Sequence, residues 1–131
     1  MTVTRYPSGG PWEVMYGYAR VVRAGDRLMT AGCTSTVDGV VTHVGDPYAQ
    51  TVQAFRIALD ALAGAGAAAG DVVRTRMYVT DRGHADAVGR AHGELFGAVR
   101  PAATLVVVAG LLHPDQLVEV EVEAYMDGAG T

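Results

Sequence analysis

Three glutamates spaced two residues apart, Glu119, Glu121 and Glu123, are the residues of this chain that most directly suggest chemistry. In an extended strand, residues two apart lie on the same face. Three carboxylates on one face repel one another and gain nothing from burial, so this face needs water or a binding partner. Glu119 could activate water as a general base; the alternative is a row of solvated glutamates.

The sequence offers few other groups for catalysis or metal binding. The one cysteine, Cys33, has no base at a recognisable spacing, so we expect a small buried side chain rather than a nucleophile. The histidines lie in separate segments, at His43, His84, His92 and His113. Without a His-x-x-x-His or Cys-x-x-Cys pair, we expect no metal site. Gly64-x-Gly66 ends a predicted helix instead of following a strand, so we expect no dinucleotide cofactor.

Composition narrows the class of protein. The chain has 131 residues, of which 50% are hydrophobic and 18% charged, and this predicts a single globular domain over 1–131. The net charge is −4, there is no lysine and the arginines are scattered, which argues against a nucleic-acid or membrane surface as partner. No apolar run resembles a signal peptide or a membrane span, and a lone cysteine forms no internal disulfide, so we expect a cytoplasmic protein.

Two strands near the C-terminus are the clearest elements that could position the glutamates. Residues 102–109 are apolar at nearly every position, so both faces of this strand should be buried. Residues 117–125 alternate instead, with the glutamates on one face and valines on the other.

Capping and turn signals predict the remaining elements. Asp46-Pro47 should begin a helix that ends near Gly64, because a carboxylate cap followed by proline favours a helix start. Its predicted apolar stripe is Tyr48, Val52, Phe55, Leu59 and Leu62. The other predicted elements are a flexible arm over 1–12, a hairpin of 18–22 and 27–31, a loop or short strand within 34–42, a strand over 71–80 with Val73, Thr75, Met77 and Val79 on one face, and a helix over 83–96.

The resulting order is β-β-α-β-α-β-β, an α+β fold with a mixed sheet. Two helices can cover only one face of such a sheet. Because residues 102–109 are apolar on both faces, the uncovered face should pack against another copy of the chain. The sequence therefore predicts a homo-oligomer.

The element order, the Arg100-Pro101-Ala102-Ala103-Thr104 segment, the Val-Glu-Val-Glu strand and the helix of residues 50–62 resemble the RidA/YjgF family. The resemblance extends over about residues 18–125. It implies a chorismate-mutase-like fold with two helices on one face of the sheet, and a homotrimer with a central barrel. It also implies small-molecule clefts at the subunit interfaces. Well-known members hydrolyse enamines and imines to 2-oxo acids and ammonia.

The resemblance also assigns roles to individual residues. The family's cleft tyrosine corresponds to Tyr18, and the glycine whose N–H faces the ligand corresponds to Gly32. The glutamate that holds the hydrolytic water corresponds to Glu119, or to Glu121 if the 111–116 loop is aligned differently.

One position departs from the family pattern. The arginine that binds the substrate carboxylate is replaced by Ala103, and a methyl group cannot form that charge-assisted pair. Arg20, Arg74 and Arg76 remain candidates to replace it from elsewhere in the chain. With Ala103, Leu105 and Cys33 lining it, the cleft is expected to be more apolar than usual.

The resemblance, together with Ala103, implies hydrolysis or tautomerisation of an imine, enamine or related carbonyl compound that lacks the usual carboxylate. Glu119 and Tyr18 are the expected catalytic residues. The alternative is a non-catalytic ligand-binding or chaperone-like member of the same fold. Ribonuclease activity, attributed to some relatives, fits poorly with the acidic charge.

Overall fold

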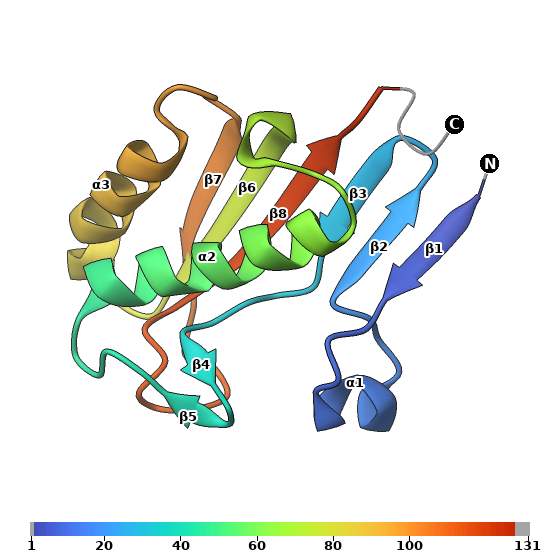
Figure 1. Ribbon diagram of the computed structural model, residues 1–131. Coiled ribbons are helices and arrows are strands. Elements are labelled where there is room, and N and C mark those ends of the chain that lie inside the picture. The colour runs from blue at the N-terminus through green and yellow to red at the C-terminus, as the bar shows by residue number, and fades with distance from the viewer. Residues whose placement is uncertain (1, 128–131) are drawn as a thin grey trace.

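The computed structural model describes residues 2–127 as a six-stranded sheet, a small two-stranded sheet and three α-helices (Figure 1). The strands are β1 (Val3–Tyr6), β2 (Val21–Ala24), β3 (Arg27–Thr30), β4 (Thr36–Val37), β5 (Val40–Val41), β6 (Val72–Val79), β7 (Ala102–Val107) and β8 (Val118–Tyr125). The helices are α1 (Pro11–Tyr16), α2 (Pro47–Gly64) and α3 (Ala85–Phe96), with 3-10 turns η1 (Ala69–Asp71) and η2 (Arg82–His84). The predicted α+β class with a mixed sheet is confirmed.

The large sheet has the strand order β1-β2-β3-β8-β6-β7, and of its described pairings only β6 with β7 is parallel. Strand β8 lies in the middle, and α2 crosses the sheet beside α3 on one face (Figure 1). The valines of β8 are buried beneath these helices, whereas its glutamates are only partly buried on the opposite face, as the alternation predicts. We call this opposite side the outer face.

Helix α2 begins as predicted but turns a different side toward the core. Asp46 caps it by accepting a hydrogen bond from the Ala49 N–H at 3.0 Å. Its buried residues are Gln50, Thr51, Ala54, Phe55, Ala58 and Leu62, and the predicted Tyr48, Val52 and Leu59 are only partly buried. The polar Gln50 belongs inside because its amide bonds the Asp115 carbonyl (2.8 Å) and the Leu117 N–H (2.9 Å), which fixes the loop before β8.

A β-bulge changes the predicted facing of β6. The register against β8 shifts between Val72 and Arg74, so Val72 is buried and Val73 is 50% exposed. The prediction that Val73 shares the buried face of Thr75 is therefore wrong, because a bulge inserts one extra residue and resets the alternation.

The N-terminal segment has regular structure where the sequence predicts a flexible arm. Strand β1 pairs antiparallel with β2, and α1 begins at Pro11 and ends at Gly17, which adopts a left-handed conformation with φ of 77°. Glycine is favoured at such a helix end because it has no Cβ to strain. Two elements thus precede the predicted β-β-α-β-α-β-β order.

Strand β7 is mostly exposed in the single chain, in contrast to the prediction of burial on both faces. Leu105 packs partly against the core, whereas Val106 and Val107 are 41% and 52% exposed. The reason is position: β7 is the edge strand, which the two helices leave largely uncovered.

Replacing Gly89, within α3, and Gly97, at its C-terminal end, by alanine should change the free energy of unfolding in opposite directions. Gly89 is exposed and a Cβ there would meet no atom within 4 Å, so Gly89→Ala should raise the free energy of unfolding by about 0.5–1 kcal/mol. At Gly97 a Cβ would lie 2.6 Å from the Gly93 carbonyl oxygen, so Gly97→Ala should be destabilising. Chemical denaturation of both variants measures the contrast, and stabilisation by Gly97→Ala would contradict it.

Candidate active site

The glutamates of β8 are not equivalent on the outer face. Glu123 lies among three arginines: Arg74 is 3.5 Å away, Arg27 3.8 Å and Arg76 3.9 Å. These cross-strand ion pairs offset the like-charge repulsion that the sequence pattern predicts. Glu123 is therefore a charge-balanced structural residue.

Glu121 has a different partner. The Tyr78 hydroxyl of β6 donates a hydrogen bond to its carboxylate. This hydrogen bond, followed by burial, raises the pKa of Tyr78, which keeps the phenol protonated as the donor. The Glu121 carboxylate is thus occupied as the hydrogen-bond acceptor of a side chain on the neighbouring strand β6.

Glu119 is the one carboxylate of this row without a hydrogen bond or ion pair to the described residues. It lies instead against Gly32, where a Cβ would overlap its Oε2 atom and lie 2.9 Å from Cδ and 3.3 Å from Cγ. Only glycine allows this approach. The two residues that the family resemblance pairs are therefore in direct contact, and Glu121 is not the one beside Gly32.

The Gly32 segment is held by its flanking residues. Cys33 exchanges backbone hydrogen bonds with Val120 (2.8 and 2.9 Å), and the Ala31 N–H donates to the Arg20 carbonyl at 2.9 Å. The Gly32 N–H itself donates to no group within residues 2–127. An unused donor next to an unpartnered carboxylate can bind a polar ligand.

Burial raises the pKa of Glu119, the charge of Glu121 raises it further, and the Arg20 charge acts in the opposite direction. A raised pKa makes a carboxylate a stronger base and brings its titration closer to the pH at which proton transfer is needed. Glu119 is therefore suited to proton transfer.

Arg20 brings a positive charge to this site. Its Nη1 donates to the Gly32 carbonyl at 2.6 Å and lies 3.6 Å from the Cys33 sulfur. The guanidinium carbon also lies over the Tyr18 ring, 5.8 Å from its centroid. Tyr18, which is 40% exposed, thereby marks the edge of the site.

Cys33 is only 2% exposed, as expected for a small buried side chain. Burial raises the pKa of its thiol, and Arg20 offsets this in part. A protonated, buried thiol is a poor nucleophile, so its role here is to pack behind the Gly32 segment.

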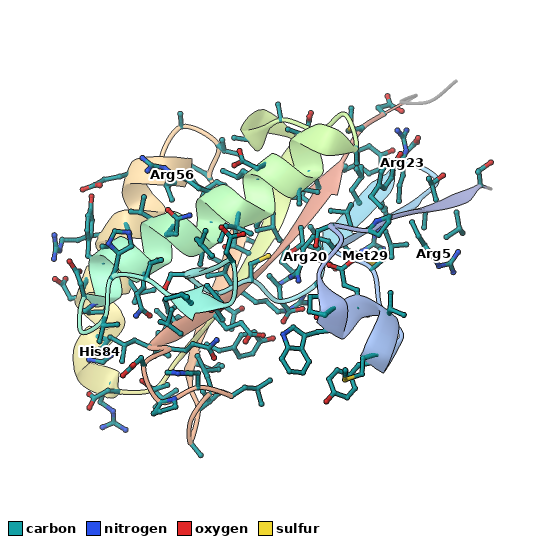
Figure 2. All side chains as sticks on the ribbon, turned by 60° about the horizontal axis from the view of Figure 1, so that its bottom comes forward. Arg5, Arg20, Arg23, Met29, Arg56 and His84 are labelled. Carbon is teal, nitrogen blue, oxygen red and sulfur yellow. The ribbon has the colours of Figure 1, made fainter. Side chains whose placement is uncertain are left out.

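An open pocket of about 700 Å³ adjoins the site between α1 and strands β1–β3, where Arg5 and Met29 are labelled in Figure 2. Tyr18 and Ala31 lie at its border, and Val22 and Met29 give it an apolar wall. The pocket can therefore hold the apolar part of a ligand whose polar end reaches Gly32.

Comparisons with known proteins show which family the chain belongs to. The family profile of Endoribonuclease L-PSP matches residues 12–126. The Streptomyces coelicolor protein SCO2049 is 49% identical over 94% of this chain and 92% of the relative. Rv2704 from Mycobacterium tuberculosis, a solved member of the YjgF/YER057c/UK114 family, is 42% identical with a TM-score of 0.86, over 95% of this chain and 100% of that one. PA3499 from Pseudomonas aeruginosa is 29% identical with a TM-score of 0.83, over 96% and 94% of the two chains.

The chain belongs to the YjgF/RidA family. Within this YjgF/RidA chain, the structure brings together Tyr18, Gly32, Cys33 and Glu119 of the residues selected from the sequence. It does not bring Ala103 and Leu105 to them. Their register places these two beside Thr75 and Met77, so they lie on the side of the sheet that carries the helices, opposite to the outer face.

Sequence reasoning missed the residues that surround Arg20. Glu13 is 4% exposed and belongs to α1, whereas the sequence pattern predicts a flexible arm over 1–12 and no element over 13–17. Pro11 at the first helical position and Gly17 at the end are the signals that could have found it.

The described residues contain no group of three or more His, Cys, Asp or Glu placed to hold a metal ion. Within the same residues, none of the helices has the length and apolarity needed to cross a bilayer.

Proposed function

We propose that this YjgF/RidA chain hydrolyses or tautomerises small imines, enamines or related carbonyl compounds at the Gly32–Glu119 site. The observation that supports this most directly is the contact between an unpartnered carboxylate and a glycine with an unused N–H. Family membership supports the same class of chemistry. Arg20 adds a positive charge close by.

The chemistry needs one proton carrier and one fixed donor. Glu119 accepts a proton from water as the oxygen attacks the imine carbon, and then returns it to the nitrogen. In the resulting carbinolamine, Glu119 takes the hydroxyl proton and delivers it to the nitrogen. The C=O bond forms as the C–N bond breaks, and the electron pair of that bond leaves with ammonia. One water is thus consumed for each ammonia released. The Gly32 N–H donates to the polar group at the reacting carbon, and Tyr18 orients the substrate from the edge.

The substrate is proposed to be larger and less charged than a simple 2-imino acid. Ala103 offers no charge for a carboxylate, and the adjoining pocket has an apolar wall formed by Val22 and Met29. Burying an apolar substituent there supplies about 25 cal/mol per Å².

We also propose that a second copy completes the cleft. Glu119 and Ala103 lie on opposite faces of one sheet, so a site containing both needs β7 of another chain. The exposed Val106 and Val107 would be covered in the same assembly, for which we propose the homotrimer with a central barrel. Sedimentation equilibrium should give three times the chain mass of 13.6 kDa, and a monomer would contradict this arrangement.

The first experiment measures imine hydrolysis with imines generated in place by an amine oxidase and an amino-acid oxidase. Wild type should hydrolyse uncharged imines with apolar side chains better than 2-imino acids. Ala103→Arg should increase activity on 2-imino acids by on the order of tenfold, since it restores a charge-assisted pair. If wild type prefers 2-imino acids, another residue binds the carboxylate and the proposed substrate class is wrong.

The second candidate is a ligand-binding protein without turnover. The specific observation in its favour is the open pocket beside the Gly32–Glu119 site. The alanine at position 103, where the resemblance expects the carboxylate-binding arginine, is consistent with lost turnover. On this reading, wild type binds apolar carbonyl compounds but releases no ammonia from any imine. Ribonuclease activity, which the family's name mentions, is disfavoured because Glu123 pairs with Arg27, Arg74 and Arg76 on the outer face.

A further inference from the structure

A chain of polar contacts connects the N-terminal segment to the candidate site. The Ser8 N–H donates to Glu13 Oε1 at 2.9 Å, and the Ser8 hydroxyl donates to Oε2. Burial by itself would raise the pKa of Glu13, but the Ser8 hydrogen bonds and the Arg20 charge outweigh it and lower the pKa overall. A buried carboxylate that stays ionised needs such partners.

Glu13 in turn holds Arg20. Its Oε2 lies 3.8 Å from Arg20 Nη2, and the two side chains are 4% and 18% exposed. The other guanidinium nitrogen, Nη1, points at the Gly32 carbonyl. The planar guanidinium is therefore fixed on both sides, by α1 and by the Gly32 segment.

Arg20 contacts the segment that faces Glu119 through both backbone and side chain. Its carbonyl accepts from the Ala31 N–H, and its guanidinium donates to the Gly32 carbonyl and approaches the Cys33 sulfur. The peptides on either side of the Gly32 N–H are thus both held. A donor whose direction is fixed in advance binds a ligand without reorganisation.

We propose that Arg20, tethered by Glu13, is the positioning residue that holds the Gly32 N–H and the Glu119 carboxylate in register for the reaction. Its catalytic meaning rests on the proposed function, whereas its effect on the geometry and charge of the site does not. Nothing in the family resemblance assigns a role to position 20.

Electrostatics give the same residue a measurable signature. Glu119 is faced by Glu121 on its own strand, Tyr78 on β6, and Cys33 and Arg20 on the Gly32 side. Of these groups, Arg20 is the cation, and it opposes the rise in the Glu119 pKa. Removing its charge must shift that pKa upward, and the acidic limb of kcat/KM against pH must move to higher pH with it.

The test separates charge from geometry with Arg20→Gln and Arg20→Lys, using Arg27→Gln on the same face as the matched control. The Glu119 carboxyl is titrated by carbon NMR, and exchange of the Cys33 amide reports the Gly32 segment. Arg20→Gln should raise the Glu119 pKa and reduce kcat/KM by about tenfold to a hundredfold. Arg20→Lys should leave the pKa near the wild-type value but speed Cys33 exchange, because one ammonium cannot replace the fork.

Arg27→Gln should change neither the Glu119 pKa nor the exchange rate of the Cys33 amide, since Arg27 contacts Glu123 and is 66% exposed. The proposal is overturned if Arg20→Gln leaves the Glu119 pKa unchanged, or if Arg27→Gln shifts it equally. Should Arg20→Gln fail to fold, the Cys33 amide exchange rate of Arg20→Lys still tests the proposal. An exchange rate equal to that of wild type overturns the positioning role of Arg20. If no protein releases ammonia from any imine, the proposed function fails while the NMR comparison still stands.

Discussion

Glu119→Gln is expected to reduce kcat/KM by about a hundredfold to ten-thousandfold, the usual loss when a general base is removed. The amide keeps the size of the side chain but cannot accept the proton of the attacking water. Ligand binding should survive, because the Gly32 N–H and the pocket are untouched. Steady-state ammonia release and calorimetric titration with a product carbonyl compound measure the two effects.

The same substitution should make the folded chain more stable at neutral pH. The folded-state pKa of Glu119 is raised above its ordinary value of 4.5, so the folded state prefers the protonated carboxyl. This preference is fully present below 4.5 and is lost as pH rises through the folded-state pKa. Because glutamine carries no charge, the stability difference in favour of Glu119→Gln should grow over that pH range.

Glu123→Gln, four residues away on the same face, is the matched control. Glu123 is paired with three arginines, so its loss should lower the free energy of unfolding, by no more than about 1 kcal/mol because the arginines are exposed. Activity should stay near that of wild type. Equal stability changes for the two glutamine variants, at every pH, would mean that Glu119 is an ordinary solvated glutamate.

These contrasts show what the sequence could and could not predict. The alternation of residues 117–125 places all three glutamates on the outer face, and Asp46-Pro47 locates the start of α2. Alternation alone cannot tell Glu119 from Glu121, since the difference comes from partners on other strands: Tyr78 on β6 and the glycine before the Cys33 bridge.

The misses have a common physical origin in contacts between distant or irregular segments. The β-bulge that exposes Val73 is not indicated by any feature of the local sequence. The Ser8–Glu13–Arg20 chain lies in a segment without hydrophobic periodicity, so neither helix nor site is visible there. The exposed faces of β7 belong to a different case: apolar sequence correctly indicates a surface that prefers burial, but one chain cannot show what covers it.

Gly32→Ala is expected to reduce kcat/KM as much as Glu119→Gln does, through a single added methyl group. The new Cβ would overlap Glu119 Oε2, so the carboxylate must rotate away from the Gly32 N–H. Gly32 is not among the residues with positive φ, so the backbone accepts alanine without strain and the effect arises from this contact. Folding should lose about 0.5–1.5 kcal/mol, the cost of turning a side chain out of its preferred rotamer.

A double-mutant cycle assigns that loss to the contact itself. In the Glu119→Ala background no carboxylate opposes the new methyl group, so Gly32→Ala should then cost almost nothing in the free energy of unfolding. Gly110→Ala is the control for adding a methyl group, since a Cβ there meets no atom within 4 Å and its φ is not positive. If Gly32→Ala is equally destabilising with and without the Glu119 carboxylate, some other contact requires glycine at position 32. The close approach of Glu119 to Gly32 would then not be the reason for glycine in this site.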